Sequence, residues 1–281
     1  MIKYVYISDL FYGQVNGGAE ANDDVLIKSL EHLGHKVDKI QSHLFAERIS
    51  SLNTKNTQFI VSNFCNLSLA SKSFLKQKAN YVIYEHDHKY LASRNPAKFR
   101  DFKAPENKLI NLEFYQRAKK IFCQSDFHLK IVRKNLGTTA NLFNVSGNLW
   151  DKKHLDKMRE LSFFEKTNLY AILESKVAHK NTDGAIKFCE QNNMPYTVIA
   201  PMEYDKFLNT LSDKRGLVFF PRTPETLCRV AVEARMMNLE IFTNSLLGAK
   251  YEPWFTKKGI PLIEQMNNKF NDVYNELQKS L

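Results

Sequence analysis

Short apolar runs alternate with helical segments along nearly the whole chain, and this alternation restricts the fold more than any other feature. In the first half, the expected strands are residues 2–7, 35–40, 59–64, 81–84, 120–124 and 141–145. In the second half they are residues 169–173, 196–200, 217–220 and 240–243. Strands that alternate with helices form parallel sheets covered by helices on both faces. We therefore expect an α/β protein with two Rossmann-like doubly wound parallel sheets, whose ligands bind at the carboxyl ends of the strands.

The helices expected between and after these strands cover residues 19–33, 127–136, 181–192, 204–211, 227–237 and 263–281. The first should bury Leu26, Leu30 and Leu33, and Gly34 is placed to end it. Ser125 is placed to cap the second helix.

A charged stretch, residues 147–168, separates the two runs of strands and helices. A chain of 281 residues is long enough for two domains, each with a core of its own. We place the boundary at residue 149, which predicts domains 1–149 and 150–281 that face a cleft. The final helix could then pack back on the N-terminal domain.

Composition excludes several classes of protein. The chain is 43% hydrophobic and 25% charged, which is typical of a globular protein and not of a disordered one. Asp9 interrupts the first apolar run too early for a signal peptide, and no apolar run approaches the roughly 18 residues that span a bilayer. The four cysteines, which lie far apart in apolar runs, are expected to be buried thiols rather than disulfides or zinc ligands. They are Cys65, Cys123, Cys189 and Cys228. We expect a soluble, cytoplasmic protein, in the host cytoplasm if the chain is viral.

The balance of 40 Lys and Arg against 30 Asp and Glu gives a net charge of +10. Such a charge favours polyanionic partners, namely nucleic acid, an anionic membrane surface or phosphorylated ligands. A lysine-rich solvated surface is an equally good explanation. Within the first half, residues 89–108 interleave basic and aromatic side chains and fit no strand or helix period, which is typical of a functional loop.

Two carboxylates mark an otherwise apolar helical segment in the second half. Residues 227–237 are apolar nearly all round, as in a buried helix, yet they include Glu233. Thr223 is placed as the cap and Pro224 as the first helical residue, which would put Glu225 in the first turn. A carboxylate on such a helix needs a partner or a ligand.

Five motifs, in order along the chain, resemble those of a known family. They are a Gly-Gly-Ala-Glu loop, a strand ending in a histidine, a strand leading to a serine and a helix, a strand with a basic loop, and Glu-x7-Glu. The chain carries them at Gly17–Glu20, Tyr84–Asp87, Ile121–Ser125, Glu174–Lys180 and Glu225–Glu233. The chain thus resembles the retaining nucleotide-sugar glycosyltransferases of the glycogen-synthase-like superfamily, which have the GT-B fold. Residues 238–241 do not match the family's Gly-x-Pro-Val strand.

The resemblance implies that the second domain holds a nucleotide-sugar donor. Glu225 would then accept hydrogen bonds from sugar hydroxyls, and Glu233 from ribose hydroxyls. Eight residues apart on one helix, the two would be separated by about 12 Å. The residues leave a structural alternative open, in which Glu225 favours the helix dipole and Glu233 pairs with Arg229 four residues earlier.

The resemblance extends to the phosphate groups of the donor. Lys180 stands where the family has its phosphate lysine, and Lys176 is nearest to the arginine that usually precedes it. Their charge would neutralise the leaving diphosphate. Gly17 and Gly18 would let backbone N–H groups approach the phosphate or the acceptor. Thr226 also belongs to the implied donor site. Solvated lysines and a plain turn are the structural alternatives.

His86 follows a buried strand, where the family places a histidine close to the transferred sugar, and His88 competes with it for that role. The implied catalytic residues are His86, Glu225 and Lys180. The candidate acceptor-binding residues are Glu20, His88, Arg94, Lys98 and Arg100.

The resemblance implies an enzyme that transfers a hexose or similar sugar, with retention, from a nucleotide diphosphate to an acceptor hydroxyl. No side chain is a clear nucleophile, which suits a retaining mechanism without a covalent enzyme intermediate. No Asp-x-Asp motif is present, so no catalytic metal is expected, and no other cofactor is expected either. The expected acceptor is a saccharide or a glycolipid, with peripheral membrane contact in the second case. One alternative is a hydroxymethylated base in phage-type DNA, flipped from its stack. Another is a non-catalytic nucleic-acid-binding module.

Overall fold

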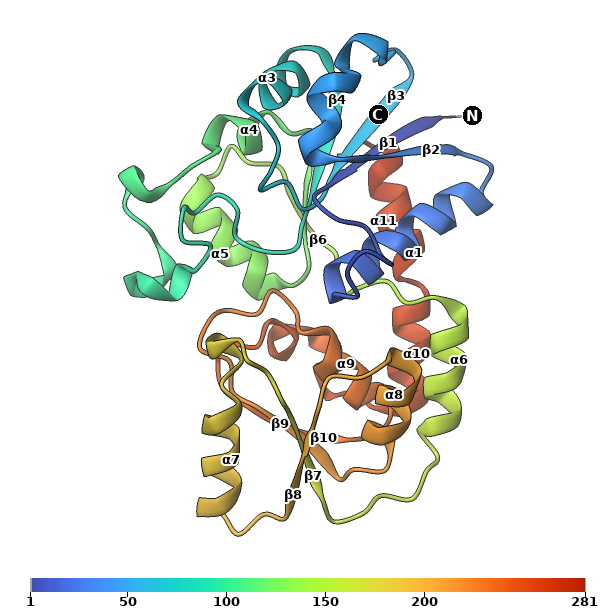
Figure 1. Ribbon diagram of the computed structural model, residues 1–281, viewed down its shortest axis with the longest axis vertical. Helices are drawn as coiled ribbons and strands as arrows, with labels where there is room; N and C mark the ends of the chain where they lie inside the picture. Colours follow the sequence, from blue (N-terminus) through green and yellow to red (C-terminus); the bar gives the residue numbers. More distant parts are fainter. Residues whose placement is uncertain (1, 281) are drawn as a thin grey trace. The chain divides into compact units, whose positions relative to one another are not determined.

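The computed structural model describes residues 2–280 as two compact units (Figure 1). The first unit comprises Met1–Trp150 together with Asn268–Leu281, and the second comprises Asp151–Asn267. Among residues 2–280, no helix has both the length and the apolar character that crossing a membrane requires.

The first unit is built on a parallel six-stranded sheet in the order β2-β1-β3-β4-β5-β6. Its strands are β1 (Lys3–Ser8), β2 (Lys36–Gln41), β3 (Thr57–Val61), β4 (Asn80–Glu85), β5 (Ile121–Cys123) and β6 (Leu142–Asn144). All five pairings are parallel. The chain moves outward in one direction from β1 to β2 and in the other from β1 to β3, so a crevice is expected at the carboxyl ends of β1 and β3.

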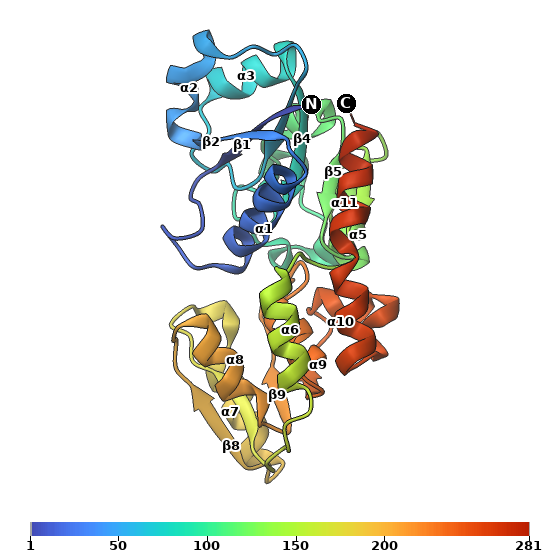
Figure 2. The same cartoon turned by 90° about the vertical axis from the view of Figure 1, so that its right-hand side faces the viewer.

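Helices cover both faces of this sheet because its strand residues alternate between two apolar cores. Tyr4 and Tyr6 belong to one core, and Val5 and Ile7 belong to the other. Helices α1 (Gly18–His32) and α11 (Lys269–Gln278) contribute to the core of Tyr4 and Tyr6. The opposite core receives side chains from α2 (Phe45–Arg48), α3 (Leu69–Lys78), α4 (Leu112–Arg117) and α5 (Asp126–Leu136). Figure 2 shows α1 and α11 together beside the strands.

The second unit has a parallel four-stranded sheet in the order β10-β9-β7-β8. Its strands are β7 (Tyr170–Leu173), β8 (Tyr196–Ile199), β9 (Gly216–Phe219) and β10 (Glu240–Thr243). Its helices are α6 (Lys152–Leu161), α7 (Thr182–Gln191), α8 (Tyr204–Ser212), α9 (Arg229–Met236) and α10 (Gly259–Asn267). The ten strands confirm the expected fold class of two parallel sheets with helices. The charged stretch between the sheets contains α6, which Asp151 caps by accepting from the His154 N–H at 2.8 Å.

The single helix predicted for residues 263–281 is wrong, because the segment forms two helices. Helix α10 ends at Asn267 and α11 starts at Lys269. Leu262 and Met266 are buried on the first helix, and Val273 and Leu277 are buried on the second. The two buried sets serve the cores of different units, so the segment is not one continuous amphipathic helix.

Two smaller expectations are also wrong. Leu33 is 48% exposed, because α1 ends at His32 and Leu33 lies beyond the buried stripe of that helix. Cys65 is exposed in the loop after β3, whereas Cys123 and Cys189 are buried as expected. All four cysteines are free thiols, in line with the expected absence of a disulfide framework.

Candidate active site

Two loops of the first unit meet at the carboxyl ends of β1 and β3. The Asp9 N–H donates to the Asn63 carbonyl at 2.7 Å, which ties the loop after β1 to the loop after β3. The Asp9 carboxylate accepts from the N–H groups of Cys65 and Asn66 at 2.8 and 3.0 Å. The first loop leads into the Gly-Gly-Ala-Glu motif at the start of α1.

Neither glycine of this motif adopts an unusual backbone conformation, but Gly17 allows a close approach. Gly17 is the N-cap of α1 with φ −92°, and neither it nor Gly18 has a positive φ. A Cβ on Gly17 would lie 2.2 Å from Oε2 of Glu20, so no larger residue fits without moving Glu20. Oε1 of Glu20 accepts from the Asn63 amide at 3.1 Å. Glu20 therefore holds the start of α1 against the loop after β3.

His86 lies at the end of β4, and its ring contacts side chains from α1 and from the residue after β5. Its Nε2–H donates to Asp23 of α1 at 2.7 Å, and Ser62 donates to the other oxygen of Asp23 at 2.5 Å. The amide of Gln124 donates to Nδ1 of His86. Only 3% of the His86 side chain is exposed. The ring is thus firmly oriented, and both of its nitrogens are engaged within the unit.

Asp23 and Gln124 were missed in the sequence, although Asp23 carried a signal. It stands three residues before Leu26 and seven before Leu30, on the stripe that α1 buries. A carboxylate on a buried stripe needs a partner. Which histidine is that partner depends on the sheet, and no spacing along the chain reveals it.

His88 is also buried, with its Nδ1 2.8 Å from the hydroxyl of Tyr90. Its ring packs edge-on against His128, with 5.2 Å between the centroids. Burial lowers the pKa of His128 well below its usual range, and the neighbouring His88 lowers it further. The structure therefore places His88 inside the unit and not on an exposed acceptor surface.

The basic-aromatic segment 89–108 separates its two kinds of side chain. Arg94 is exposed and pairs with Asp87, Lys98 is exposed, and the side chain of Arg100 is 97% exposed. Its aromatic rings turn inward instead. Tyr90 is fully buried, Phe99 packs against the core, and Phe102 packs edge-on against Phe127. Phe99 and Phe102 remain partly exposed, and Lys89 is buried in an ion pair with Glu85. The segment thus presents most of its cations to solvent and leaves only part of two rings on which a base could stack.

In the second unit, Lys180 and Glu225 meet at the carboxyl end of the sheet. Lys180 follows β7 and Glu225 follows β9, and the ammonium lies 2.7 Å from Oε1 of the carboxylate. Burial alone would lower the pKa of Lys180, but the Glu225 carboxylate outweighs it and raises the pKa above its usual range. The ammonium also lies 5.7 Å from the centroid of the Phe219 ring. Lys176, in the same loop, is exposed.

Glu225 is not in a helix, and the expected cap at Thr223 with Pro224 as first helical residue is wrong. Helix α9 starts at Arg229, after Cys228 in a left-handed conformation with φ 78°. The Glu225 N–H donates to the Leu246 carbonyl at 2.8 Å, and the Gly248 N–H donates to the Glu225 carbonyl at 3.0 Å. This pairing holds residue 225 extended beside the loop after β10. The separation of about 12 Å inferred for two carboxylates on one helix therefore does not apply.

Glu233 lies on α9 and is 1% exposed. Its Oε1 accepts from Nε of Arg229 at 2.9 Å and from the hydroxyl of Tyr204 at 2.6 Å. The structural alternative, an ion pair with the residue four positions earlier, is present. Tyr204, at the start of α8, was missed because it is 29 residues away in sequence. Thr226 lies beside Glu225 and is partly buried.

Among residues 2–280, no group of three or more His, Cys, Asp or Glu side chains is arranged to hold a metal ion.

No protein-family model matches the chain, and no curated protein sequence matches it. Solved structures do resemble it. Sucrose-phosphate synthase from Thermosynechococcus elongatus matches 99% of this chain over 91% of its own, with a TM-score of 0.61 and 9% identity. HepE from Anabaena, in complex with UDP and glucose, matches 100% over 92%, with a TM-score of 0.61 and 13% identity.

A third match is an alpha-glucosyltransferase in complex with UDP and a 13-mer DNA containing an HMU base. It matches 99% of this chain over 90% of its own, with a TM-score of 0.51 and 13% identity. At such identities the likeness establishes the architecture, which is the GT-B fold that the sequence motifs led us to expect.

Proposed function

We propose that this chain, which has the GT-B fold, is a glycosyltransferase that moves a sugar from a nucleotide diphosphate to an acceptor hydroxyl. The observation that carries the proposal is the Lys180–Glu225 pair at the carboxyl end of the second sheet. An open α/β sheet binds ligands at that edge. Two of the similar structures, HepE and the alpha-glucosyltransferase, are complexes with UDP, which supports a nucleotide-sugar donor.

In this proposal, Lys180 and Glu225 divide the donor between them. The ammonium of Lys180 neutralises the diphosphate as negative charge develops on the leaving oxygen. The carboxylate of Glu225 accepts hydrogen bonds from hydroxyls of the transferred sugar. Helix α9 starts four residues after Glu225, so its first N–H groups can also face the diphosphate. The salt bridge between the two side chains orients both before a donor arrives.

We propose that transfer proceeds with retention. The acceptor hydroxyl attacks the anomeric carbon on the face from which the diphosphate leaves and gives its proton to the departing phosphate oxygen, so no covalent intermediate with the enzyme forms. Lys180 and Glu225 both act on the donor, and His86 is the proposed residue near the transferred sugar. Because both of its ring nitrogens are engaged, His86 would present its ring edge or its main chain there.

For Glu233 we propose a role toward the ribose. Its carboxylate already accepts from Tyr204 and Arg229, so a ribose hydroxyl would share or displace the Tyr204 bond. Burial and the Glu233 carboxylate raise the pKa of Tyr204 well above its usual range, so this phenol stays protonated as a donor. A tyrosine that can swing away would give the nucleotide access to a buried carboxylate.

A saccharide or glycolipid is the proposed acceptor. Nucleic acid is a second candidate, which the exposed cations of residues 89–108 favour because they can contact phosphates. The aromatic rings of the same segment weigh against it, since Tyr90 is buried and Phe99 and Phe102 are partly covered by their packing, which leaves little ring surface for stacking.

The proposal is tested by incubating the protein with a panel of nucleotide sugars, alone and with oligosaccharides, glycolipid or hydroxymethylated DNA. Nucleotide release is followed, and the anomeric configuration of the product is determined by NMR.

Glu225→Gln should lower kcat by about 100-fold, as expected when a group that stabilises the transition state is lost. Glu233→Gln should mainly raise KM for the donor. The matched control is Glu165→Gln, an exposed carboxylate of the same unit. If no donor is turned over, and neither site variant changes the affinity for any nucleotide, the protein is not this kind of transferase.

We also propose that transfer needs no resident metal, because Lys180 supplies positive charge where the diphosphate leaves and the sequence has no Asp-x-Asp motif. Turnover should survive excess EDTA. Loss of turnover that added Mg²⁺ or Mn²⁺ restores would contradict this.

A further inference from the structure

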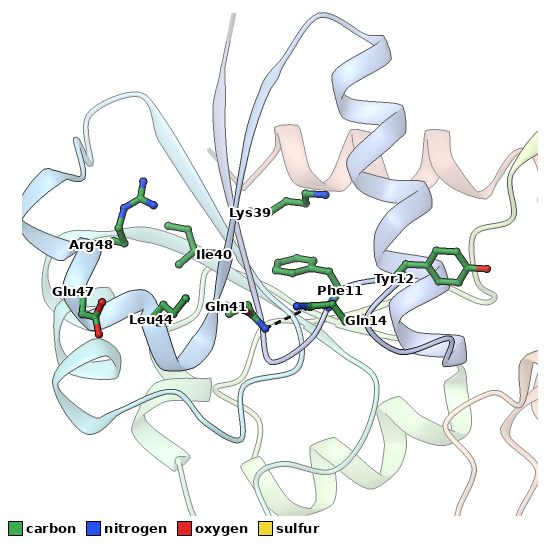
Figure 3. Close-up of a pocket in the computed structure, with 9 residues that line it drawn as sticks. All are labelled: Phe11, Tyr12, Gln14, Lys39, Ile40, Gln41, Leu44, Glu47 and Arg48. Atoms are coloured by element: carbon green, nitrogen blue, oxygen red, sulfur yellow. Dashed lines mark hydrogen bonds between the residues drawn. The ribbon is translucent and has the colours of Figure 1, made fainter.

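A hollow of about 450 Å³ lies at the carboxyl ends of β1 and β2 in the first unit. Figure 3 shows its lining. Phe11 and Gln14 come from the loop after β1, Lys39 and Gln41 from the end of β2, and Glu47 and Arg48 from α2. The volume lies in the range of small-molecule sites. None of these residues belongs to the hydrogen-bonded group of Asp23, Ser62, His86 and Gln124.

The hollow offers apolar surface to solvent. Tyr12 and Leu44 also line it, and each has about two fifths of its surface exposed. Phe11 packs edge-on against Tyr6 of β1, with 6.5 Å between centroids, so its position is fixed by the core. Exposed apolar side chains beside a fixed ring suit the apolar C–H face of a sugar ring.

Two glutamines at the centre of the hollow are oriented by bonds that leave half of each amide unused. Oε1 of Gln14 accepts from the Phe11 N–H at 2.9 Å and from the Gln41 amide at 3.4 Å. The Gln41 amide also lies 3.3 Å from the Asp9 carbonyl, to which it donates. Among the described residues, nothing bonds the NH₂ of Gln14 or Oε1 of Gln41. A fixed donor and a fixed acceptor side by side match a pair of neighbouring hydroxyls.

The charges around the glutamines favour an anion. In Figure 3, Lys39 lies beside Phe11 on one side of β2, and Arg48 lies with Glu47 on the other. The Lys39 ammonium is 5.7 Å from the centroid of the Phe11 ring, a cation–π contact that keeps it in place. Within the described part of the chain, neither Lys39 nor Arg48 has a carboxylate within salt-bridge distance. Two cations against the single Glu47 leave one net positive charge.

We infer that this hollow binds the acceptor, and that the acceptor is a saccharide that carries an anionic group, a carboxylate or a phosphate. The sugar ring lies over the end of β2, with neighbouring hydroxyls on Gln14 and Gln41 and the anion on Lys39 or Arg48. The inference rests on the proposed glycosyl transfer, whose acceptor it narrows to a chemical class.

The test measures binding without any sugar donor. Glucuronate, glucose 6-phosphate, glucose and inorganic phosphate are titrated into the full chain and followed by NMR shifts. One exposed charge pair changes affinity by up to about fivefold. We therefore expect one or both anionic sugars to bind about fivefold more tightly than glucose and than inorganic phosphate. The preferred sugar distinguishes a carboxylate source from a phosphate source. Equal affinity for glucose would overturn the inference, and so would equal affinity for inorganic phosphate, which marks a bare anion site.

Charge variants separate this site from a folding defect. Lys39→Gln and Arg48→Gln together should weaken binding of the preferred anionic sugar about fivefold, whereas Glu47→Gln should strengthen it. Opposite effects from neighbouring residues cannot come from loss of structure. The matched control is Lys36→Gln, an exposed lysine three residues earlier on the same strand and outside the hollow. The inference would be contradicted if all the variants bound the sugar with wild-type affinity. It would also be contradicted if duplex DNA displaced the sugar and Lys36→Gln weakened binding as much as the variants in the hollow.

The outcome separates two failures. If donor is turned over with neutral acceptors, and Lys39→Gln with Arg48→Gln leaves KM for the acceptor unchanged, the transferase stands and the anionic acceptor is wrong. If anionic sugars bind and no donor is ever turned over, the binding site stands and the transferase proposal is wrong.

Discussion

The carboxylate of Asp23 links the start of α1 to the ends of β3 and β4 through Ser62 and His86. All three side chains lie on the carboxyl side of the sheet, where the loops that follow the strands come together. A buried carboxylate with two donors is far less costly than an unpaired one, so the cluster can hold its geometry without water. Its consequence for function is a histidine whose orientation is set before any ligand binds.

Lys180 and Lys176 share one loop, which allows a direct comparison of their roles. Lys180→Met should lower kcat by about 100-fold or more, because the substitution removes a charge that stabilises the leaving diphosphate. Lys176→Met serves as the matched variant, since Lys176 is exposed while Lys180 pairs with Glu225. Steady-state kinetics with the best donor checks both. Equal losses would mean that both lysines contact phosphate, and no loss from Lys180→Met would remove it from the site.

His128 should make the first unit sensitive to acid. Burial, and then the nearby His88, lower its pKa in the folded state, while in the unfolded chain it takes up a proton below about pH 6.5. The unfolded state thus binds more protons, and the free energy of unfolding falls as pH drops below that value. The slope from this group is at most about 1.4 kcal/mol per pH unit. Urea unfolding between pH 7 and 5 measures it.

His128→Gln keeps a donor near the Asp87 carbonyl but cannot titrate, so its pH slope should be shallower than that of the wild type. His32→Gln, at an exposed position on α1, is the control and should leave the slope unchanged. A wild-type slope in His128→Gln would show that another group controls acid unfolding.

At the level of elements, strand ends rather than helices position the candidate donor site. Lys180 follows β7 and Glu225 follows β9, and these two strands are neighbours in the sheet. The extended pairing of Glu225 with the loop after β10 brings a third strand end to the same place. Helix α9 contributes Glu233 and Arg229 to a separate buried cluster with Tyr204. The two carboxylates of the Glu-x7-Glu motif are therefore held by different neighbours: Glu225 by Lys180 and the loop after β10, and Glu233 by Arg229 and Tyr204.

Helix α5 offers a test of a cap that the sequence predicted and the structure confirms. Oγ of Ser125 accepts from the His128 N–H at 3.1 Å. Ser125→Ala should lower the free energy of unfolding by about 1–2 kcal/mol, because it leaves a buried N–H without its acceptor. Ser125→Thr keeps a hydroxyl and should cost less. Chemical denaturation followed by circular dichroism checks both, and equal losses would assign the effect to packing rather than to the cap.

At the level of the whole molecule, the chain returns to its first unit at the end. Helix α11 packs with α1 in the core of Tyr4 and Tyr6, and Gln58 donates to the Leu277 carbonyl at 3.1 Å. The ammonium of Lys120, beside β5, pairs with Glu276. One face of the first sheet is therefore covered by a helix that lies more than 100 residues beyond the last strand of that sheet, so the first unit needs both ends of the chain.

Leu277→Ala should destabilise the first unit and leave the second intact. Leu277 is fully buried, so its truncation should cost about 2–5 kcal/mol. Hydrogen exchange resolved by peptide would then show faster exchange in β1, β3 and β4 but not in β7 and β9. Asn275→Ala, exposed on the same helix, is the control and should change stability by less than about 0.5 kcal/mol. Uniform loss of protection in both units would contradict their separate description.

Much of the fold could be predicted because strands and capped helices are written in local patterns. All ten strands were expected within a few residues, since most of them are short apolar runs between turn signals. The Ser125 cap and the end of α5 before Gly137 follow from residue chemistry at adjacent positions. Helix α6 was not expected, because its charged sequence resembles a linker until its buried Leu155, Met158 and Leu161 are known.

The sequence by itself determined the order of strands and helices and the residues with chemistry to offer, because both depend on neighbours along the chain. Only the tertiary structure decided which of them meet. Glu225 is extended because the loop after β10 supplies its backbone partners, and His86 is engaged because Asp23 and Gln124 arrive from other elements. Hydrogen bonds and burial between residues distant in sequence set those positions, and local propensity cannot encode them.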